Sequence, residues 1–407
     1  MKDEVCIEAG ETKTLDYVDG NLRLKRHAKV KGKGEPPKLT VAGNIYCDGK
    51  NTFDCSVYAE SLEAEDDVTI HGDLEIKNRI EVEDGKLEVY GNLKADHVNV
   101  DNELYVERNI QARTVNVGGS IKVRGDMDAA DIDVGGSFKA EGKVKAKTVD
   151  VGGSLKIESQ AEIKKMKVGG AAKVTGGKIW EIDVGGVFES KGRLEFEKID
   201  VGGVVRINGD SNKGEKIDVG GKLEVKGSLS SKDIEVGGVF HVNGKLEGED
   251  VKVGGKMKVD GELKLTGDIE VGGKMEVKNT IQAKNIKVGG VLNAKKIEAE
   301  EYVEVGGSVE TEDGVKAKFF RIGKRGRVHG AIRADRVIIG KEAQVEDIYG
   351  REIILRHEAR ARNVYGEIVD IESGCRINGE IKYTRELRMN ERVYLAKQPQ
   401  KVDKLPL

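Results

Sequence analysis

Bulky side chains are scarce in this chain. Aromatic residues make up only 4% of its 407 residues, and tryptophan occurs once. A large globular core normally uses more aromatic bulk, so this composition favours a narrow core filled by small and β-branched side chains. The prolines lie near the two ends, at Pro36, Pro37, Pro399 and Pro406. Residues 38–398 therefore lack the residue that would remove a backbone donor from a β-ladder.

Cysteines and long apolar segments are also few. The four cysteines (Cys6, Cys47, Cys55 and Cys375) are too few for a disulfide scaffold in a chain of this length. Cys47 and Cys55 lack the spacing and flanking histidines of a metal site, so we expect ordinary thiols. No segment approaches the ~18 apolar residues of a membrane-spanning helix, and residues 1–13 contain no apolar stretch typical of a signal peptide. We therefore expect a cytoplasmic protein without a membrane span.

Charge of one sign is not in excess. Charged residues make up 35% of the chain, but 69 basic and 72 acidic residues leave a formal net charge of -3. This balance gives no bulk attraction to nucleic acid or to anionic lipid. We therefore expect no general nucleic-acid binding.

A Val-Gly-Gly tripeptide recurs twelve times at nearly equal steps along the chain. The short period indicates one small structural unit stacked on copies of itself. An array of this kind favours a long surface over an enzyme pocket. The repeat valines are Val117, Val134, Val151, Val168, Val184, Val201, Val219, Val236, Val253, Val271, Val288 and Val305.

Each repeat contains three short segments in which apolar residues alternate with others. Such alternation predicts three β-strands per turn of ~17 residues, with every second side chain inside. We therefore expect an all-β fold, a triangular (three-sided) parallel β-helix or β-solenoid whose turns lie roughly 4.8 Å apart. In residues 149–168 the apolar pairs are Val149 and Val151, Leu155 and Ile157, Ala161 and Ile163, and then Met166 and Val168 as the cycle restarts.

Two columns of uncharged side chains are predicted to fill the core. They stand four and six positions after each repeat valine. A helix is disfavoured here, since two glycines per repeat would cost it about 2 kcal/mol. The first column is Ile121, Phe138, Leu155, Ala172, Phe188, Val205, Leu223, Phe240, Met257, Met275, Leu292 and Val309. The second is Val123, Ala140, Ile157, Val174, Ser190, Ile207, Val225, Val242, Val259, Val277, Ala294 and Thr311.

The glycine pairs are expected at the corners of the turns. Glycine reaches positive φ and has no Cβ atom, so identical corners can stack closely. A phosphate-cradling loop is the alternative, but no Lys-Ser or Lys-Thr follows the pairs. Near the N-terminus the period lengthens, because the steps from Val18 to Val41 and from Val41 to Ala64 both exceed the step between repeat valines. The second long step predicts an expanded corner at residues 51–55.

The signature changes after Gly307. Residues 322–340 read Ile-Gly-Lys-Arg-Gly-Arg-Val-His-Gly-Ala-Ile-Arg-Ala-Asp-Arg-Val-Ile-Ile-Gly, and residues 364–368 and 374–381 repeat parts of this cadence. The cadence resembles that of bactofilins, the polymer-forming cytoskeletal proteins, directly over residues 322–381 and by architecture elsewhere. The resemblance implies a right-handed β-helix and end-to-end assembly into filaments without nucleotide.

Solenoid acyltransferases and carbonic anhydrases use similar Ile-Gly hexapeptides, so an enzyme is the distant alternative. A zinc site would need histidines clustered from neighbouring turns. The step from His329 to His357 is not a multiple of the turn, and the other histidines (His27, His71, His97 and His241) are isolated. A lone His329 as an acyl-transfer base is the weaker interpretation beside a solvent-facing histidine. We therefore expect no enzyme activity, no metal and no cofactor.

Two outward-facing columns carry opposite charge. The residue before each repeat valine is mostly acidic, and the residue five positions after it begins as a run of lysines. A solvated face that resists aggregation is one interpretation. Lateral pairing of filaments or binding of a charged partner is the second, and cation binding by the acidic column is the third. The candidate residues are Asp133, Asp150, Asp183 and Asp200, with Lys122, Lys139, Lys156 and Lys173.

A basic run lies where the two signatures meet. It is the best candidate for a patch that binds a polyanion or another partner, although Phe319 and Phe320 alone give little support for base stacking. A rim of exposed arginines is the alternative. The residues are Lys316, Lys318, Arg321, Lys324, Arg325, Arg327, Arg333 and Arg336.

The sequence therefore predicts four segments. These are an irregular start or cap (1–60), the Val-Gly-Gly solenoid (61–318), a bactofilin-like solenoid (319–384) and a C-terminal tail or cap (385–407). The predicted function is that of a structural scaffold that forms a homo-oligomer or homopolymer through the ends of the solenoid. The main alternative is a capped, monomeric rod that presents a charged surface to a protein or polyanion.

Overall fold

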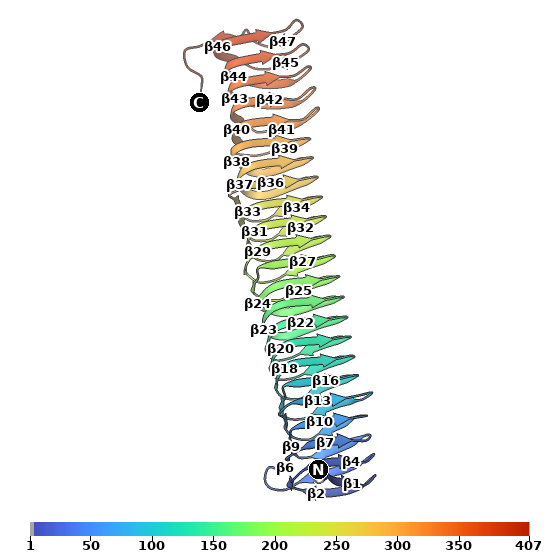
Figure 1. The fold of residues 1–407 in the computed structure, drawn as a ribbon. Helices are drawn as coiled ribbons and strands as arrows, with labels where there is room; N and C mark the ends of the chain where they lie inside the picture. Colours follow the sequence, from blue (N-terminus) through green and yellow to red (C-terminus); the bar gives the residue numbers. More distant parts are fainter. Residues whose placement is uncertain (1–3, 407) are drawn as a thin grey trace. The chain divides into compact units, whose positions relative to one another are not determined.

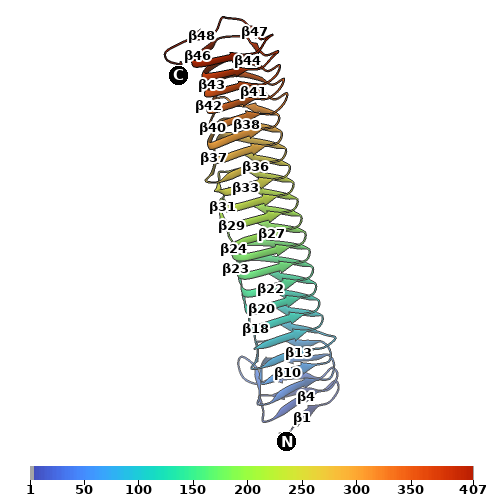
Figure 2. The same ribbon diagram turned by 45° about the horizontal axis from the view of Figure 1, so that its top comes forward.

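The computed structural model describes residues 4–406, which form β-strands and connecting turns without a helix. The chain divides into two compact units, residues 1–203 and residues 204–407. Together they contain about 23 turns of ~17 residues. The division falls inside the Val-Gly-Gly array, and the segment boundaries expected at residues 60, 318 and 384 stay predictions. The strands of successive turns follow one another along each unit (Figures 1 and 2).

Strands β1–β27 belong to the first unit. Their bounds are β1 (Glu4–Ile7), β2 (Thr12–Leu15), β3 (Tyr17–Val18), β4 (Asn21–Leu24), β5 (Lys29–Gly32), β6 (Lys38–Val41), β7 (Asn44–Cys47), β8 (Asn51–Asp54), β9 (Ser56–Ala59), β10 (Ser61–Ala64), β11 (Val68–Ile70), β12 (Leu74–Ile76), β13 (Arg79–Val82), β14 (Lys86–Val89), β15 (Leu93–Lys94), β16 (His97–Val100), β17 (Glu103–Val106), β18 (Ile110–Val117), β19 (Ser120–Val123), β20 (Met127–Val134), β21 (Ser137–Ala140), β22 (Val144–Val151), β23 (Ser154–Val168), β24 (Ala171–Val184), β25 (Val187–Ser190), β26 (Leu194–Glu195) and β27 (Lys198–Val201).

Strands β28–β48 belong to the second unit. Their bounds are β28 (Val204–Ile207), β29 (Ser211–Val219), β30 (Lys222–Val225), β31 (Ser228–Val236), β32 (Val239–Val242), β33 (Leu246–Val253), β34 (Lys256–Val259), β35 (Leu263–Leu265), β36 (Asp268–Val271), β37 (Lys274–Val288), β38 (Val291–Val305), β39 (Ser308–Glu310), β40 (Val315–Ile322), β41 (Arg327–His329), β42 (Ile332–Ile339), β43 (Gln344–Leu355), β44 (Arg360–Ile371), β45 (Arg376–Ile377), β46 (Ile381–Met389), β47 (Tyr394–Leu395) and β48 (Gln400–Lys401).

Each turn contributes to three parallel ladders. The strand that ends at a repeat valine pairs with its equivalent one turn away, so that Val117 lies opposite Val134; we call this the valine ladder. The strand after the glycine pair forms the post-glycine ladder, in which Ile121 lies opposite Phe138. The remaining strand forms the third ladder, in which Ile110 lies opposite Met127. The predicted parallel β-solenoid is thus confirmed, while its triangular section and right hand stay predictions.

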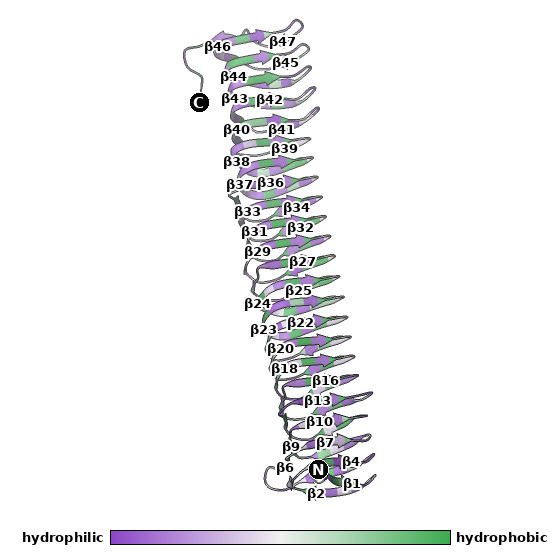
Figure 3. Ribbon diagram, viewed as in Figure 1, coloured by the Kyte–Doolittle hydropathy of each residue, from purple (hydrophilic) through white to green (hydrophobic). Residues whose placement is uncertain are grey.

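Alternation of side chains along the strands fills the core. Hydrophobic and hydrophilic residues alternate along the strands (Figure 3), and both predicted core columns are buried throughout, from Ile121 to Val309 and from Val123 to Thr311. Phe138 and Phe240 are among the largest fully buried side chains. Burial of each large apolar side chain stabilises the fold by roughly 1.5–3 kcal/mol. Ser190 and Thr311 are also buried, and their hydroxyls donate hydrogen bonds to the carbonyl oxygens of Gly192 (2.9 Å) and Lys295 (2.8 Å).

The glycine pairs lie at corners, as expected, but the reason differs from the expected one. None of the Val-Gly-Gly glycines that the structure describes has positive φ. What requires glycine is the closeness of the neighbouring turn, because a Cβ atom on Gly153 would lie 2.5 Å from the carbonyl oxygen of Gly136. The amide of Gly153 donates a 2.9 Å hydrogen bond to that same oxygen. The ladder therefore continues through the corner, with no space for a side chain on the glycine.

The N-terminal register corrects one expectation. Residues 51–54 form strand β8, so the expanded corner predicted at residues 51–55 is wrong. Val41 lies opposite Val18, as expected, but Ala64 lies opposite Cys47 rather than Val41, at the ordinary step of the repeat. The single long step arises from residues 33–37, which separate β5 from β6 and contain Pro36 and Pro37. Apart from this loop, residues 4–59 join the same three ladders.

Candidate interaction surfaces

Histidine and cysteine side chains do not gather into a reactive site. Within residues 4–406 no group of three or more His, Cys, Asp or Glu side chains could hold a metal ion. His329 is paired with Glu346 at 3.7 Å, and His357 Nδ1 lies 3.0 Å from Ser373 Oγ. All four cysteines are free thiols, and Cys47 and Cys55 are buried. Burial raises the pKa of Cys55 to about 11, which suits a thiol that packs in the core.

The acidic column of the first unit forms as the sequence predicts. Asp133 lies opposite Asp150, and Asp183 lies opposite Asp200, with Lys167 between the two pairs. Of these residues only Asp200 forms an ion pair within residues 4–406, to Lys198 at 3.1 Å. Like charges thus face solvent one turn apart along the valine ladder.

The lysine column of the first unit is largely neutralised. Lys122, Lys139, Lys156 and Lys173 lie opposite one another along the post-glycine ladder. Three of them have glutamate partners: Lys139 is 2.8 Å from Glu141, Lys173 is 3.0 Å from Glu189, and Lys156 pairs with Glu158. Lys122 instead lies 5.5 Å from the ring of Tyr105. These pairs favour the interpretation of a solvated face. Exposed ion pairs of this kind contribute little to the free energy of folding, and they leave few lysine charges free for a partner.

The basic run of the second unit is spread over several ladders. Lys316 lies opposite Arg333 on the third ladder, whereas Arg327 belongs to β41 on the post-glycine ladder. The other five members all have acidic partners: Lys318 with Glu301 (2.8 Å), Arg321 with Glu304 (3.3 Å), Lys324 and Arg325 with Glu342 (3.7 and 2.7 Å) and Arg336 with Glu352 (3.2 Å). The structure therefore does not bring the eight residues together into one patch.

No family model, curated protein or solved structure matches the chain. The assignment of the β-solenoid fold therefore rests on the registers and burial described above. The resemblance of residues 322–381 to bactofilins stays a prediction. No helix among residues 4–406 is long and apolar enough to span a membrane.

A groove along the first unit was not predicted. It has a volume of about 960 Å³, and its floor includes Ala95, Ala112, Ala129 and Ala146 from four successive turns. Because an alanine side chain ends at Cβ, this column is recessed between longer side chains. Trp180, the single tryptophan, lies at one end and is 39% exposed. The repetition of alanine at the same position of successive turns was the sequence signal that could have revealed the groove.

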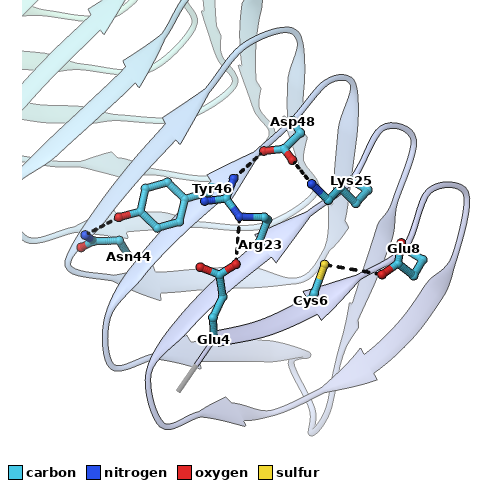
Figure 4. Close-up of polar contacts among 8 residues, drawn as sticks. All are labelled: Glu4, Cys6, Glu8, Arg23, Lys25, Asn44, Tyr46 and Asp48. Carbon is cyan, nitrogen blue, oxygen red and sulfur yellow. Dashed lines mark hydrogen bonds and ion pairs between the residues drawn. The ribbon is translucent and has the colours of Figure 1, made fainter. Parts of the chain in front are cut away.

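Polar contacts connect the first three turns (Figure 4). Arg23 of the second turn donates to Glu4 of the first at 2.9 Å and to Asp48 of the third at 2.8 Å. Lys25 donates to Asp48 at 2.6 Å, and the Arg23 guanidinium lies 4.8 Å from the ring of Tyr46. Hydrogen bonds from Lys25 and Arg23 lower the pKa of the Asp48 carboxyl despite its partial burial. These contacts hold the N-terminal turns to one another on one face.

The last turn of the second unit leaves apolar side chains partly uncovered. In β46 and β47, Leu387, Met389 and Leu395 lie opposite the buried Val369, Ile371 and Ile377, so they continue the core columns. Met389 is 42% exposed, and the two leucines are half-buried. β48 covers only the start of β46, at Lys382 and Tyr383. Within the described residues, nothing pairs with the outer edges of β47 or of residues 386–389.

Proposed function

We propose that this protein is a non-enzymatic, cytoplasmic structural scaffold that assembles end to end without nucleotide, like the bactofilins that residues 322–381 resemble. A right-handed, triangular solenoid is part of this proposal. The partly exposed Met389 at the end of a core column is the observation that carries it. An uncovered strand edge with apolar side chains can pair with another chain, and burial of those side chains favours the contact.

A capped rod that does not polymerise is the second candidate, and the N-terminal end favours it. Lys13 lies opposite the fully buried Val30, so a lysine stands at the end of a core column in the first described turn. A charge at an inward position is a known way to block pairing at an edge. If Lys13 closes this end, association through the C-terminal end stops at a pair of chains.

Electron microscopy of the purified chain, with light scattering, tests the proposal. We expect filaments without nucleotide, and we expect Met389→Lys to disrupt them because it adds a charge to the contact. Asn390→Lys is the matched control, since it adds the same charge at an exposed neighbouring residue. Filaments from the Met389→Lys variant would contradict the proposed contact. Monomers of the unaltered chain at all salt and protein concentrations would support the capped rod, and discrete pairs would support closure by Lys13.

A further inference from the structure

A pocket with basic walls lies at the corner between the valine and post-glycine ladders of the second unit. Its volume is about 480 Å³. Arg321, Lys324, Lys341, Arg356 and His357 line it, and Glu372 is the acidic residue among its lining. Of these, Arg321 and Lys324 alone belong to the basic run singled out from the sequence.

The pocket exists because the glycine column stops here. Gly323 and Gly340 form its floor, and a Cβ atom on either would overlap the carbonyl oxygen of the glycine one turn before. In the next turn Arg356 takes the equivalent position, directly after Leu355, which lies opposite Ile339. The glycine backbone therefore forms the floor of the pocket, and the side chain of Arg356 closes one end of it.

The positive groups of the pocket are only partly neutralised. Lys341 has no ion pair within residues 4–406, and it follows Gly340 as Lys324 follows Gly323. Lys324 lies 3.7 Å from Glu342, which accepts the closer contact from Arg325 at 2.7 Å. Arg321 lies 3.3 Å from Glu304, which is outside the pocket lining. Positive charge from successive turns, about 4.8 Å apart, thus surrounds one space.

Glu372 holds the closed end in place rather than filling the pocket with negative charge. Its Oε1 accepts a 2.5 Å hydrogen bond from Arg356, and its Oε2 accepts a 2.9 Å bond from the backbone amide of His357. Both carboxylate oxygens are thereby engaged. The His357 ring is fixed through the 3.0 Å contact with Ser373. The other guanidinium nitrogens of Arg356 remain available to a ligand.

We propose that this pocket binds a small, multiply charged anion that bears phosphate groups. Lysine ammonium groups and an arginine fork are the usual partners of phosphate oxygens, and more cationic groups converge here than a single carboxylate ligand would need. The volume lies in the range of roughly 300–1,000 Å³ found for small-molecule sites. No Phe, Tyr or Trp among the described residues lines the pocket, and the one lining ring, that of His357, is held by Ser373, so a stacked nucleic-acid base is disfavoured.

Calorimetric titration of the full chain with tripolyphosphate tests this site. We expect saturable binding that becomes roughly tenfold weaker in Lys341→Gln, because one hydrogen bond to a charged group is lost. Arg356→Gln should weaken it similarly, but it also removes the partner of Glu372, so Lys341→Gln is the primary variant. Lys284→Gln is the matched control, since Lys284 is exposed on another part of the second unit and has no ion pair among residues 4–406. It should bind as the unaltered chain does.

Two further ligands distinguish the sources of phosphate. A soluble inositol phosphate and vesicles that carry the same headgroup should both lose binding in Lys341→Gln if the headgroup enters the pocket. If Lys341→Gln weakens binding of the soluble compounds but not of the vesicles, the ligand is a free phosphate compound rather than a lipid headgroup. The proposal is overturned if tripolyphosphate shows no saturable binding, if Lys341→Gln binds it normally, or if Lys284→Gln weakens it equally. Tighter binding of single-stranded RNA than of tripolyphosphate would also overturn it.

Discussion

At the scale of single residues, the close stacking of the corners depends on the absence of a Cβ atom in glycine. The amide of Gly136 bonds to Gly119 and the amide of Gly153 bonds to Gly136, each at 2.9 Å. A Cβ atom on Gly136 or Gly153 would lie 2.5 Å from the same carbonyl oxygens. Close approach of one backbone to another, rather than a left-handed backbone conformation, therefore keeps these positions as glycine.

Gly153→Ala should consequently destabilise the first unit. The added methyl group must displace the corner of the neighbouring turn, and overpacking of this kind costs about 1–3 kcal/mol. Urea unfolding measured by circular dichroism would report the loss. Ser154→Ala is the control, since Ser154 is exposed and next in the chain, and its free energy of unfolding should change by less than about 0.5 kcal/mol. Equal stability of the two variants would contradict the steric explanation.

Asp260 stabilises the second unit through contacts with two lysines and a histidine. Its carboxylate lies 2.9 Å from Lys278, 3.1 Å from His241 and 3.5 Å from Lys258. The ion pair with Lys278, with help from the hydrogen bond to His241, lowers the pKa of Asp260 to about 2 against the opposing effect of burial. Because the folded pKa lies below the unfolded value of about 3.9, the stabilisation is present above about pH 4 and is lost as the pH falls through about 2.

Asp260→Asn should therefore cost about 2 kcal/mol near neutral pH and progressively less in acid. Urea unfolding of the variant and the unaltered chain at a series of pH values measures this difference. Asp233→Asn, at an exposed aspartate without an ion pair among the described residues, should show no such trend. A difference between Asp260→Asn and the unaltered chain that stays constant with pH would rule out the proposed linkage.

At the scale of strands, the alternation of apolar and polar residues explains how much of the fold could be predicted. Positions such as Phe138 and Val242 follow the repeat valine at fixed distances, so their burial follows from the period alone. The partner of Ala64 was predicted wrongly because the loop at residues 33–37 interrupts that period. The pocket with basic walls could not be predicted from the sequence, because Arg321, Lys341 and Arg356 belong to different turns and meet only when three turns are in register.

Phe240 offers a test of packing within one ladder. Its side chain is fully buried between Leu223 and Met257 of the adjacent turns. Phe240→Ala should destabilise the second unit by about 3–5 kcal/mol because it leaves a cavity. Phe240→Leu keeps most of the volume and should cost less than about 1.5 kcal/mol. Similar free energies of unfolding for the two variants would show that the core collapses around the missing ring.

At the scale of the whole molecule, stability comes from many similar contacts between neighbouring turns. Within each unit a turn pairs only with the turn before and the turn after it, as expected for a repeat protein. Its core is built from valine, isoleucine and leucine with few aromatic rings. Turns at the outer edge of a unit have one neighbour instead of two, so they are less protected from opening.

Hydrogen exchange should therefore be fastest in the turns with one described neighbour, β1–β3 and β47–β48, and slowest in central strands such as β20 and β37. Mass spectrometry of peptides after exchange in deuterated buffer would measure this order. If chains polymerise end to end, protection of residues 386–395 and of β1–β3 should both rise with protein concentration, whereas closure by Lys13 should leave the protection of β1–β3 constant. Uniform exchange along each unit would contradict the nearest-neighbour description.

The stacked glycine corners have a consequence for how such a chain can vary during evolution. A segment that runs from one pair to the next, such as residues 136–152, carries one full turn with its own corner and its own core side chains. Duplication or loss of such a segment leaves every remaining glycine opposite another glycine. Shorter insertions and deletions are taken up elsewhere in the turn, because Gly185 still lies against Gly169 although the step from Val168 to Val184 is one residue shorter than most. Among relatives, whole turns should therefore be gained or lost more readily than the corner glycines are replaced.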